Sequence, residues 1–455
     1  TWERRRVRTV GFFGSISLTW KDQLFLNITG RNDIVSSMPR NNRSFFYPSV
    51  SLAYVLTELE ALKGNPILSF AKVRGSFAQV GQAGTYYENY YYSPSYSGGF
   101  WTNRPIIYPI GGINAFESYP ELYDPKLKPQ NTNSYEAGFD VRLFNNRLSI
   151  DYTFSRQNIK NQIFPVPLAG STGASQYMAN GGKIHTNAHE IIISGQAINT
   201  ADFTWDIGMN WSFIRNMVDE LAPGVENIFL GGFVTPQVRA GIGDTYPVIY
   251  GTAFRRDDQG RILVDENPNS KTYGMPLTAG DPKVIAKCSP DFVMGINTSL
   301  RYKRVSLSAT FSWQHGGEMY SGTNGLLDLY GVSKKTENRT DAFVYPGYKA
   351  DGTPNDIVRG GADDPGAYET LYSDVLGNIN EYSVHDASFF KMRDLTVKYQ
   401  LPKIGWFDIS VFAFARNVLI WAKMPNFDPE SSQGNNNMGC LLYTSPSPRD
   451  MRRSR

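Results

Sequence analysis

Apolar and polar residues alternate along much of this chain, and the alternating segments come in pairs. The clearest pair is YEAGFDVRLFNNRLSIDYTFSR, residues 135–156. Odd positions from Tyr135 to Leu143 are mostly apolar, and after Asn145-Asn146 the apolar residues move to even positions, beginning with Leu148. A period of two places each kind of residue on its own face of a β-strand. Two such strands around a two-residue, Asn-rich turn predict a hairpin.

Five further pairs repeat this design, so the chain is expected to contain about twelve strands. The pairs are 14–20 with 23–31, 45–57 with 67–80, 190–200 with 203–213, 291–302 with 305–313, and 388–400 with 407–421. Many of these segments are ten residues or longer. A strand that crosses a membrane needs about 9–11 residues, whereas strands of globular proteins average about 5–6.

The connections between these strands alternate between short and long. Short turns are expected at 21–22, 58–66, 145–146, 201–202, 303–304 and 401–405, and long loops at 34–44, 81–130, 165–182, 219–287 and 321–387. Outer-membrane barrels have short turns on the periplasmic side and long loops outside. The pattern predicts an all-β, membrane-spanning antiparallel β-barrel. A large soluble all-β protein is the alternative.

The two faces of the predicted strands differ in a way that suits lipid on one side and water on the other. Aromatic residues make up 14% of the chain, and the apolar faces or strand ends carry Trp205, Trp211, Tyr152, Trp313, Trp406 and Trp421. Aromatic girdles mark the two interfaces of a bilayer. The opposite faces carry Glu136, Asp140, Arg142, Asp151, Asp206 and Asn210. Such side chains are costly in a dry core but not beside a wet lumen.

Charge and cysteine content exclude several other classes of protein. The net charge is +3, and Arg449, Arg452, Arg453 and Arg455 minus Asp450 already give +3, so the preceding residues sum to zero. We therefore expect no nucleic-acid partner, which would require a basic face. Cys440 lies in the same basic tail, and Cys288 alone makes neither an internal disulfide nor a zinc site.

Residues 123–164 resemble the barrel segment of SusC/RagA-type TonB-linked outer-membrane transporters. The matching positions are Asp124-Pro125, Leu127-Lys128, Thr132, Gly138, Asp140, Phe144, Arg147 and Leu148. Residues 30–59, 179–195, 290–320, 386–402 and 414–430 resemble further stretches in the family's order, including a final D-P-E phrase at 428–430. Ala188-His189 and Lys287-Cys288 depart from the family's usual pattern.

The resemblance implies TonB-dependent import of an oligosaccharide or a peptide, as part of a 22-stranded plugged barrel. A SusD-like surface lipoprotein would capture the ligand, and the TonB-ExbB-ExbD complex would act through the plug. Residues 1–439 are therefore expected to be the C-terminal part of such a barrel, in contact with outer-membrane lipid, with the plug and early strands preceding Thr1. No enzyme activity, cofactor or metal is implied, and the calcium-like D-x-N-x-D-G pattern of some members is absent.

The stretch most suited to binding a ligand lies in the predicted loop 81–130. Its aromatic residues are Tyr86, Tyr87, Tyr90, Tyr91, Tyr92, Phe100 and Trp101. Sugars stack their C–H faces on such rings, while phenol groups hydrogen-bond to hydroxyls. The same residues would serve equally well to fold the loop on itself or to contact the lipoprotein.

Two other sets of residues invite a chemical interpretation. His185 and His189 share one face of a strand but stand about 13 Å apart at roughly 3.3 Å per residue, which is too far to share a metal without a bend. Glu136, Asp140 and Asp151 suggest glycosidase chemistry, which needs two carboxyls about 5–10 Å apart in a cleft. A row of lumen carboxylates meets that spacing by chance.

Two rival functions remain open from the sequence. A passive porin or adhesin-like barrel would lack the plug, and a soluble all-β carbohydrate enzyme or binding module would need no membrane. At the other end of the chain, residues 440–455 contain Pro446, Pro448 and four Arg. They do not form the closing strand expected of a barrel. We interpret this tail as non-native sequence.

Overall fold

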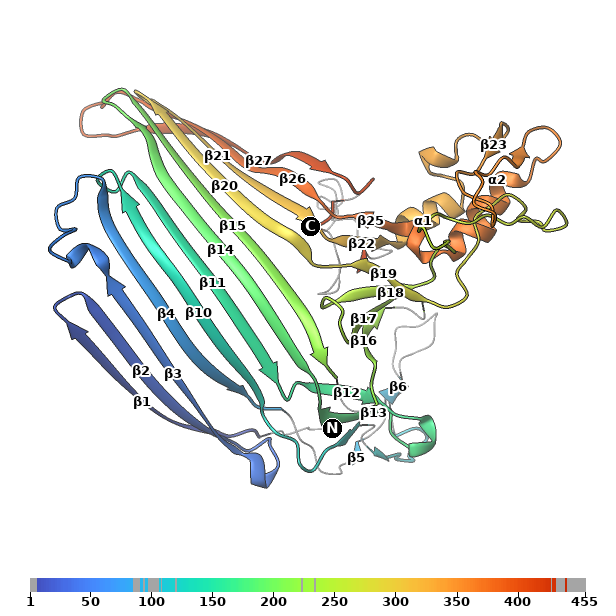
Figure 1. The fold of residues 1–455 in the computed structure, drawn as a ribbon, viewed down its shortest axis with the longest axis horizontal. Coiled ribbons are helices and arrows are strands. Elements are labelled where there is room, and N and C mark those ends of the chain that lie inside the picture. Colours follow the sequence, from blue (N-terminus) through green and yellow to red (C-terminus); the bar gives the residue numbers. More distant parts are fainter. Residues whose placement is uncertain are drawn as a thin grey trace.

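The computed structural model describes residues 6–84, 91–92, 95–96, 106–107, 109–118, 121–221, 224–232, 235–426, 428–430 and 438–439. Its main feature is one curved antiparallel sheet of twelve strands, in the order β1-β2-β3-β4-β10-β11-β14-β15-β20-β21-β26-β27 (Figure 1). The predicted tail, 440–455, lies outside the described residues, so its interpretation stays a prediction.

Six hairpins build the sheet, and all twelve predicted strands are confirmed. They are β1 (Thr9–Trp20) with β2 (Leu24–Val35), β3 (Ser44–Val55) with β4 (Leu68–Gln82), β10 (Gln130–Leu143) with β11 (Leu148–Lys160), β14 (Lys183–Asn199) with β15 (Phe203–Glu220), β20 (Pro290–Tyr302) with β21 (Val305–Gly316), and β26 (Phe389–Gln400) with β27 (Ser410–Ala422). From β4 onward the predicted alternation of short turns with long connections is confirmed, whereas the connection 36–43 between β2 and β3 is shorter than the turn 56–67 between β3 and β4. The turns gather at one end of the strands (Figure 1).

The Asn-rich turn differs from the prediction in its length. Pairing ends at Leu143 with Leu148, so four residues rather than two connect β10 to β11. Phe144, Asn145 and Asn146 have φ values of 55°, 57° and 63°. Asn adopts this left-handed region readily, whereas Phe rarely does. Alternation alone did not reveal that Phe144 leaves the ladder.

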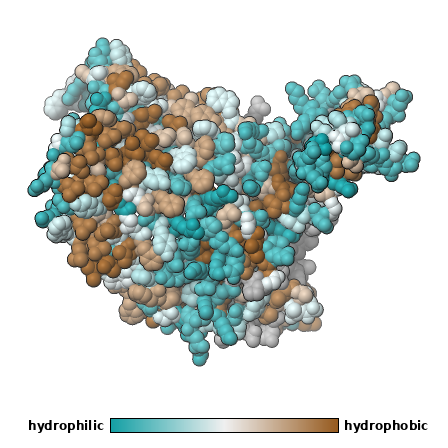
Figure 2. All heavy atoms as spheres, in the orientation of Figure 1, coloured by the Kyte–Doolittle hydropathy of each residue, from teal (hydrophilic) through white to brown (hydrophobic). Residues whose placement is uncertain are grey.

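One face of the sheet is apolar from strand to strand. Across its middle the register brings Ile150, Ile193, Met209, Ile296 and Phe311 side by side. Figure 2 shows apolar side chains gathered over the sheet at the left, whereas the part at the right is largely hydrophilic. A face with this composition is the one expected to contact lipid.

An aromatic row crosses this apolar face on the side of the long connections. It includes Phe139, Tyr152, Phe154, His189, Phe213, Trp211, Phe292 and Trp313, with neighbouring ring centroids 5.0–6.5 Å apart. Toward the turns, Trp205 and Tyr302 lie on the same face of neighbouring strands. The segment of β15 from Trp205 to Phe213, both included, is nine residues long, which matches the strand length that crosses a bilayer. Trp406 instead lies in the 401–409 turn and is 96% exposed.

The long connections were predicted only as loops, but they fold into small sheets and helices. β9 (Glu121–Tyr123), β12 (Ile163–Pro167) and β13 (Gln176–Asn180) form one sheet, and β16 (Asn227–Gly232), β17 (Gln237–Gly241), β18 (Val248–Gly251) and β19 (Lys283–Lys287) form another. β22 (Glu318–Ser321) pairs with β25 (Val384–Asp386) and β28 (Met438–Gly439).

Two connections combine into a separate body, which we call the lobe, made of residues 252–280 and 322–382. It contains α1 (Gly322–Leu329), α2 (Ala367–Glu369) with the π-helical turn Thr370–Val375, and the pair β23 (Ala342–Val344) and β24 (Val358–Gly360). It lies beyond the end of the sheet, at the right of Figure 1. Its core consists of Phe254, Met275, Ala367, Leu371, Val375, Leu376 and Ile379.

The helices of this protein are short. Within the described ranges, no helix is both long enough and apolar enough to cross a membrane.

A charge placed on the apolar face should be far more damaging than the same charge one residue away. Ile193 and Ser194 are neighbours on β14 that point to opposite faces. We expect Ile193→Arg to lower the unfolding free energy of the full-length protein in lipid vesicles by about 2–4 kcal/mol, as for a cation at the bilayer midplane. Ser194→Arg is the matched control and should change it little. Equal losses in the two variants would contradict the assignment of the faces.

Cys288 should be unreactive in the folded protein. It is buried beside Ile249 and Ala286, and burial, helped by the negative charge of Glu318, raises the pKa of the thiol to about 12. Only the thiolate is nucleophilic. We expect iodoacetamide at pH 8 to alkylate the peptide containing Cys288 at least ~10-fold more slowly in the folded protein than in urea, as read by mass spectrometry. Equal rates would show that the site is open.

Candidate functional site: a polar wall with an ionic strap

The aromatic residues predicted to bind a ligand lie largely outside the described part of the chain. This holds for Tyr86, Tyr87, Tyr90, Phe100 and Trp101. The backbone of Tyr91 and Tyr92 forms the short strand β5, which pairs with β8 (Glu117–Ser118). The binding role of this loop therefore stays a prediction, and the described residues point to the polar face of the main sheet.

The polar face forms a flat wall because long side chains lie across glycines of neighbouring strands. Arg74 on β4 reaches over β10 to Asp151 on β11, with Nη2–Oδ1 and Nη1–Oδ2 distances of 2.6 and 3.0 Å. Gly138 on β10 is paired with Arg74 on one side and with Thr153, two residues from Asp151, on the other. A Cβ atom at Gly138 would stand 3.2 Å from Arg74 Nε and 2.5 Å from the Tyr152 carbonyl oxygen. The glycine therefore makes room for the ion pair.

The same arrangement recurs twice between β15 and β20. Asn210 is paired with Gly295, and Asn297 is paired with Gly208. A Cβ atom at either glycine would lie within about 2.2 Å of the opposite amide oxygen. Each asparagine therefore covers the glycine opposite it. The wall in this region consists of amide groups that lie close to the backbone.

Near the turns, the polar wall contains a groove of about 660 Å³ that extends over β14, β15, β20 and β21. Its lining includes Gln196, Asp206, Asn297, Thr310 and Asp394. The Gln196 amide donates to Asp206 over 3.2 Å. Amide, hydroxyl and carboxylate groups dominate the groove, so it suits water and hydrogen-bonding groups rather than an apolar ligand.

The carboxylates considered for glycosidase chemistry belong to this wall. Asp151 forms the ion pair with Arg74, and Asp140 lies 3.8 Å from Lys72 and 3.5 Å from Arg142. Glu136 accepts a long hydrogen bond of 3.5 Å from Ser76. These carboxylates therefore contribute to the ionic and hydrogen-bonding pattern of an open wall.

The two histidines considered as metal ligands contact different partners. His185 Nδ1 lies 2.7 Å from Asp219 Oδ1, and His189 Nδ1 lies 2.9 Å from the Tyr152 hydroxyl. Within the described ranges, no group of three or more His, Cys, Asp or Glu side chains is arranged to hold a metal ion.

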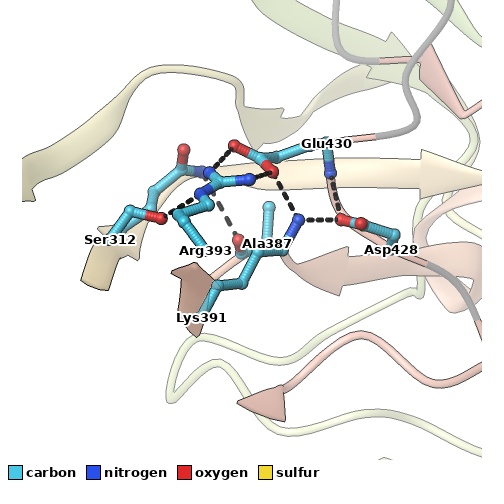
Figure 3. Close-up of polar contacts among 7 residues, drawn as sticks. Ser312, Ala387, Lys391, Arg393, Asp428 and Glu430 are labelled. Atoms are coloured by element: carbon cyan, nitrogen blue, oxygen red, sulfur yellow. Dashed lines mark hydrogen bonds and ion pairs between the residues drawn. The ribbon is translucent and has the colours of Figure 1, made fainter. Parts of the chain in front are cut away.

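At the outer end of the wall, the chain after β27 folds back and is held by charges. We call residues 423–426 and 428–430 the strap. Lys391 on β26 is only 4% exposed, and its Nζ lies 2.5 Å from Asp428 Oδ1 and also contacts Glu430 (Figure 3). The two terminal nitrogens of Arg393 donate hydrogen bonds to the two carboxylate oxygens of Glu430, and its Nε donates to the Ser312 hydroxyl over 2.6 Å. The D-P-E phrase thus fastens the strap to β26.

Further contacts support the same fastening. The Lys423 amide donates to the Ser388 carbonyl over 3.0 Å, and its side chain lies 2.7 Å from Asp386. Met424 packs with Met319 and Ala387 in a small buried cluster. A lysine as buried as Lys391 needs partner charges, and the strap supplies two.

The electrostatics of Glu430 make the strap sensitive to pH. Burial would raise the pKa of this carboxyl, but hydrogen bonds from Arg393 and Lys391 outweigh burial and hold the pKa below its ordinary value. A carboxyl whose pKa is depressed in the folded state stabilises that state above its unfolded pKa of about 4.3. The stabilisation is lost as the pH falls through the folded pKa.

In the sequence the D-P-E phrase stands out only as part of the family resemblance, and its partners on β26 were not predicted. A signal was nevertheless present. Lys391 and Arg393 are two residues apart on a strand, as are Asp428 and Glu430 in the phrase. Two cations facing two carboxylates at the same spacing are complementary, but a bulge between Met392 and Asp394 sets their final geometry.

Glu430→Gln should loosen the strap. The variant leaves Arg393 and Lys391 without one of their charged partners, which is costly for a buried cation. At pH 7 we expect faster amide hydrogen exchange in the peptide covering residues 420–430, measured by mass spectrometry on the full-length protein. Glu60→Gln, in the turn between β3 and β4, is the control and should leave this exchange unchanged.

The same measurement repeated from about pH 5 down to about pH 2, corrected for the intrinsic rate, tests the pH dependence. Exchange in the wild-type strap should begin to rise as the pH falls below about 4.3 and should reach that of Glu430→Gln only below the folded pKa of Glu430, while the variant itself should respond little. If Glu430→Gln exchanges like the wild type at pH 7, the ionic fastening is not what holds the strap.

Comparison with known proteins identifies the family that shares this architecture. A family model described as TonB dependent receptor-like, beta-barrel, matches residues 1–418. The chain is 26% identical to TonB-dependent receptor P3 of Formosa agariphila and 23% identical to TonB-dependent receptor SusC of Bacteroides thetaiotaomicron. Each match covers 94% of this chain and 42% of the relative, so the chain spans less than half the length of these curated relatives.

Solved structures agree on the fold. The RagAB peptide importer in its closed-closed state matches 95% of this chain and 46% of the importer chain, with a TM-score of 0.67 and 18% sequence identity. The family match covers most of the chain and excludes the soluble all-β alternative. The chain belongs to the TonB-dependent receptor-like β-barrel family of outer-membrane proteins, whose members are receptors and transporters rather than enzymes.

Proposed function

We propose that this protein imports an oligomeric nutrient, most readily an oligosaccharide, across the outer membrane. Energy would come from the TonB-ExbB-ExbD complex, and a SusD-like surface lipoprotein would deliver the ligand. The single observation that carries the proposal is the two-faced sheet, with a continuous apolar face, a polar wall, and folded connections at one end only. A family match over residues 1–418 supports the same interpretation.

The chemistry of the polar wall favours a hydroxyl-rich ligand. Amide and hydroxyl groups line the groove, and several charges of the wall are paired with one another. A sugar offers both donors and acceptors to such a surface, and needs no strong local charge. Peptide is the second candidate, because the solved structure that resembles this chain is titled a peptide importer.

The proposal predicts that uptake depends on energy. Cells that produce the full-length protein should accumulate a fluorescently labelled oligosaccharide, and removing TonB should reduce the initial rate at least ~10-fold, toward passive leakage. A passive porin would retain its uptake without TonB. Growth on the same oligosaccharide as sole carbon source provides a second readout.

Co-purification of the full-length protein with a surface lipoprotein tests the proposed SusD-like partner.

A further inference from the structure

The lobe contains a cavity of about 410 Å³ that is separate from the polar wall. It lies between the end of α1, the 3₁₀ turn Lys334–Thr336, and α2 with its π-helical continuation. Its lining includes Tyr330, Tyr368, Tyr372, Asp328, Arg339 and Glu369. Sites for small ligands commonly have volumes of about 300–1,000 Å³, so this cavity is large enough to bind one.

The walls of this cavity are tied together by hydrogen bonds. Arg339 Nε donates to the Thr336 carbonyl over 3.2 Å, and its Nη2 donates to the Gly331 carbonyl. The Tyr372 hydroxyl donates to the Lys335 carbonyl over 3.2 Å. These contacts join the three chain segments that surround the cavity. The shape is therefore formed before any ligand arrives, which lowers the entropy lost on binding.

Aromatic faces are the main surface that the cavity offers. Tyr330 ends α1 and is 72% exposed, which is unusual for so large a ring. Tyr368 is braced from behind by Phe343, with ring centroids 4.7 Å apart. Tyr side chains present a flat apolar face and a polar tip at little cost in conformational entropy.

Polar groups on the cavity wall supply both donors and acceptors. Arg339 Nη1 makes no hydrogen bond to another described residue and is available as a donor. Glu369 is exposed, and its only electrostatic neighbour among the described residues is Lys271, which is itself paired with Asp374. Asp328 accepts a hydrogen bond of 2.7 Å from the Tyr382 hydroxyl and lies 3.7 Å from Lys335.

The charges around the cavity are balanced, and this decides the ligand class. The charged side chains of the lining are Arg339, Asp328 and Glu369. Asp328 is paired with Lys335, which lies outside the lining, so a ligand meets one remaining cation, Arg339, and one remaining carboxylate, Glu369. A phosphate site would need an excess of cations, and a site for a free amino terminus an excess of carboxylates. Flat aromatic faces with balanced donors and acceptors suit a neutral ring that carries many hydroxyls.

We infer that this cavity binds a neutral sugar unit of an oligosaccharide, with Tyr330 as the stacking residue and Arg339 and Glu369 as hydrogen-bonding partners. The inference deepens the proposed function, and rests on it only in taking the bound glycan to be the imported nutrient. The lobe would then hold one end of a glycan outside the barrel while another part enters the lumen.

Isothermal titration of the full-length, detergent-solubilised protein tests the inference. The probes are maltohexaose, laminarihexaose, xylohexaose and mannohexaose, with a neutral hexapeptide as a different class of ligand. We expect at least one oligosaccharide to bind and Tyr330→Ala to raise its Kd by about tenfold or more. Tyr330→Phe keeps the ring and should bind nearly as well as the wild type.

Val332→Ala is the matched control, because Val332 is 67% exposed in the same turn and does not line the cavity. It should leave the Kd unchanged. The inference is overturned if no oligosaccharide of the panel binds, if only the hexapeptide binds, or if Tyr330→Ala binds like the wild type.

The uptake assay separates this inference from the proposed function. Sugar binding that depends on Tyr330, together with uptake that ignores TonB, would refute active import and leave the cavity assignment intact. TonB-dependent uptake together with unchanged sugar binding in Tyr330→Ala would refute the cavity assignment and leave active import intact.

Discussion

The constraint on which this structure depends is that every strand of the main sheet separates two environments. Backbone groups inside a membrane must be hydrogen-bonded within the protein, and an extended sheet meets that need only when neighbouring strands pair along their length. Side chains on alternate positions then face opposite environments. Ile193 and Ser194 show the result within one dipeptide. Register cannot slip by one residue without exchanging the two faces, so the alternation determines the pairing.

This constraint explains why the hairpins could be predicted from sequence and why other features could not. Period-two alternation is local, and it correctly located all twelve strands. The end of a strand is less visible. Phe144 is apolar like Leu143 before it, but it adopts a left-handed backbone conformation and leaves the ladder. Turn geometry depends on backbone energies that hydrophobicity does not report.

The lobe and the strap were not predicted, for a different physical reason. Both depend on contacts between segments far apart in the chain. Residues 252–280 and 322–382 share one core, and Glu430 reaches Arg393 across the rim. Neither contact produces a repeating pattern in the sequence. The aromatic loop residues were visible as a cluster, but a cluster alone does not say what it faces, so their role stays a prediction.

If the protein imports a glycan as proposed, the wall and the lobe would divide recognition between them. Glycines such as Gly138 let Arg74 lie flat against the sheet and pair with Asp151, so these two charges neutralise each other within the wall. An imported ligand would then meet mainly neutral hydrogen-bonding groups along the wall, which would bind it weakly. Selectivity would come from the folded connections, where rings such as Tyr330 are exposed. A transporter built this way can change its ligand by changing the connections while the two-faced sheet remains the same.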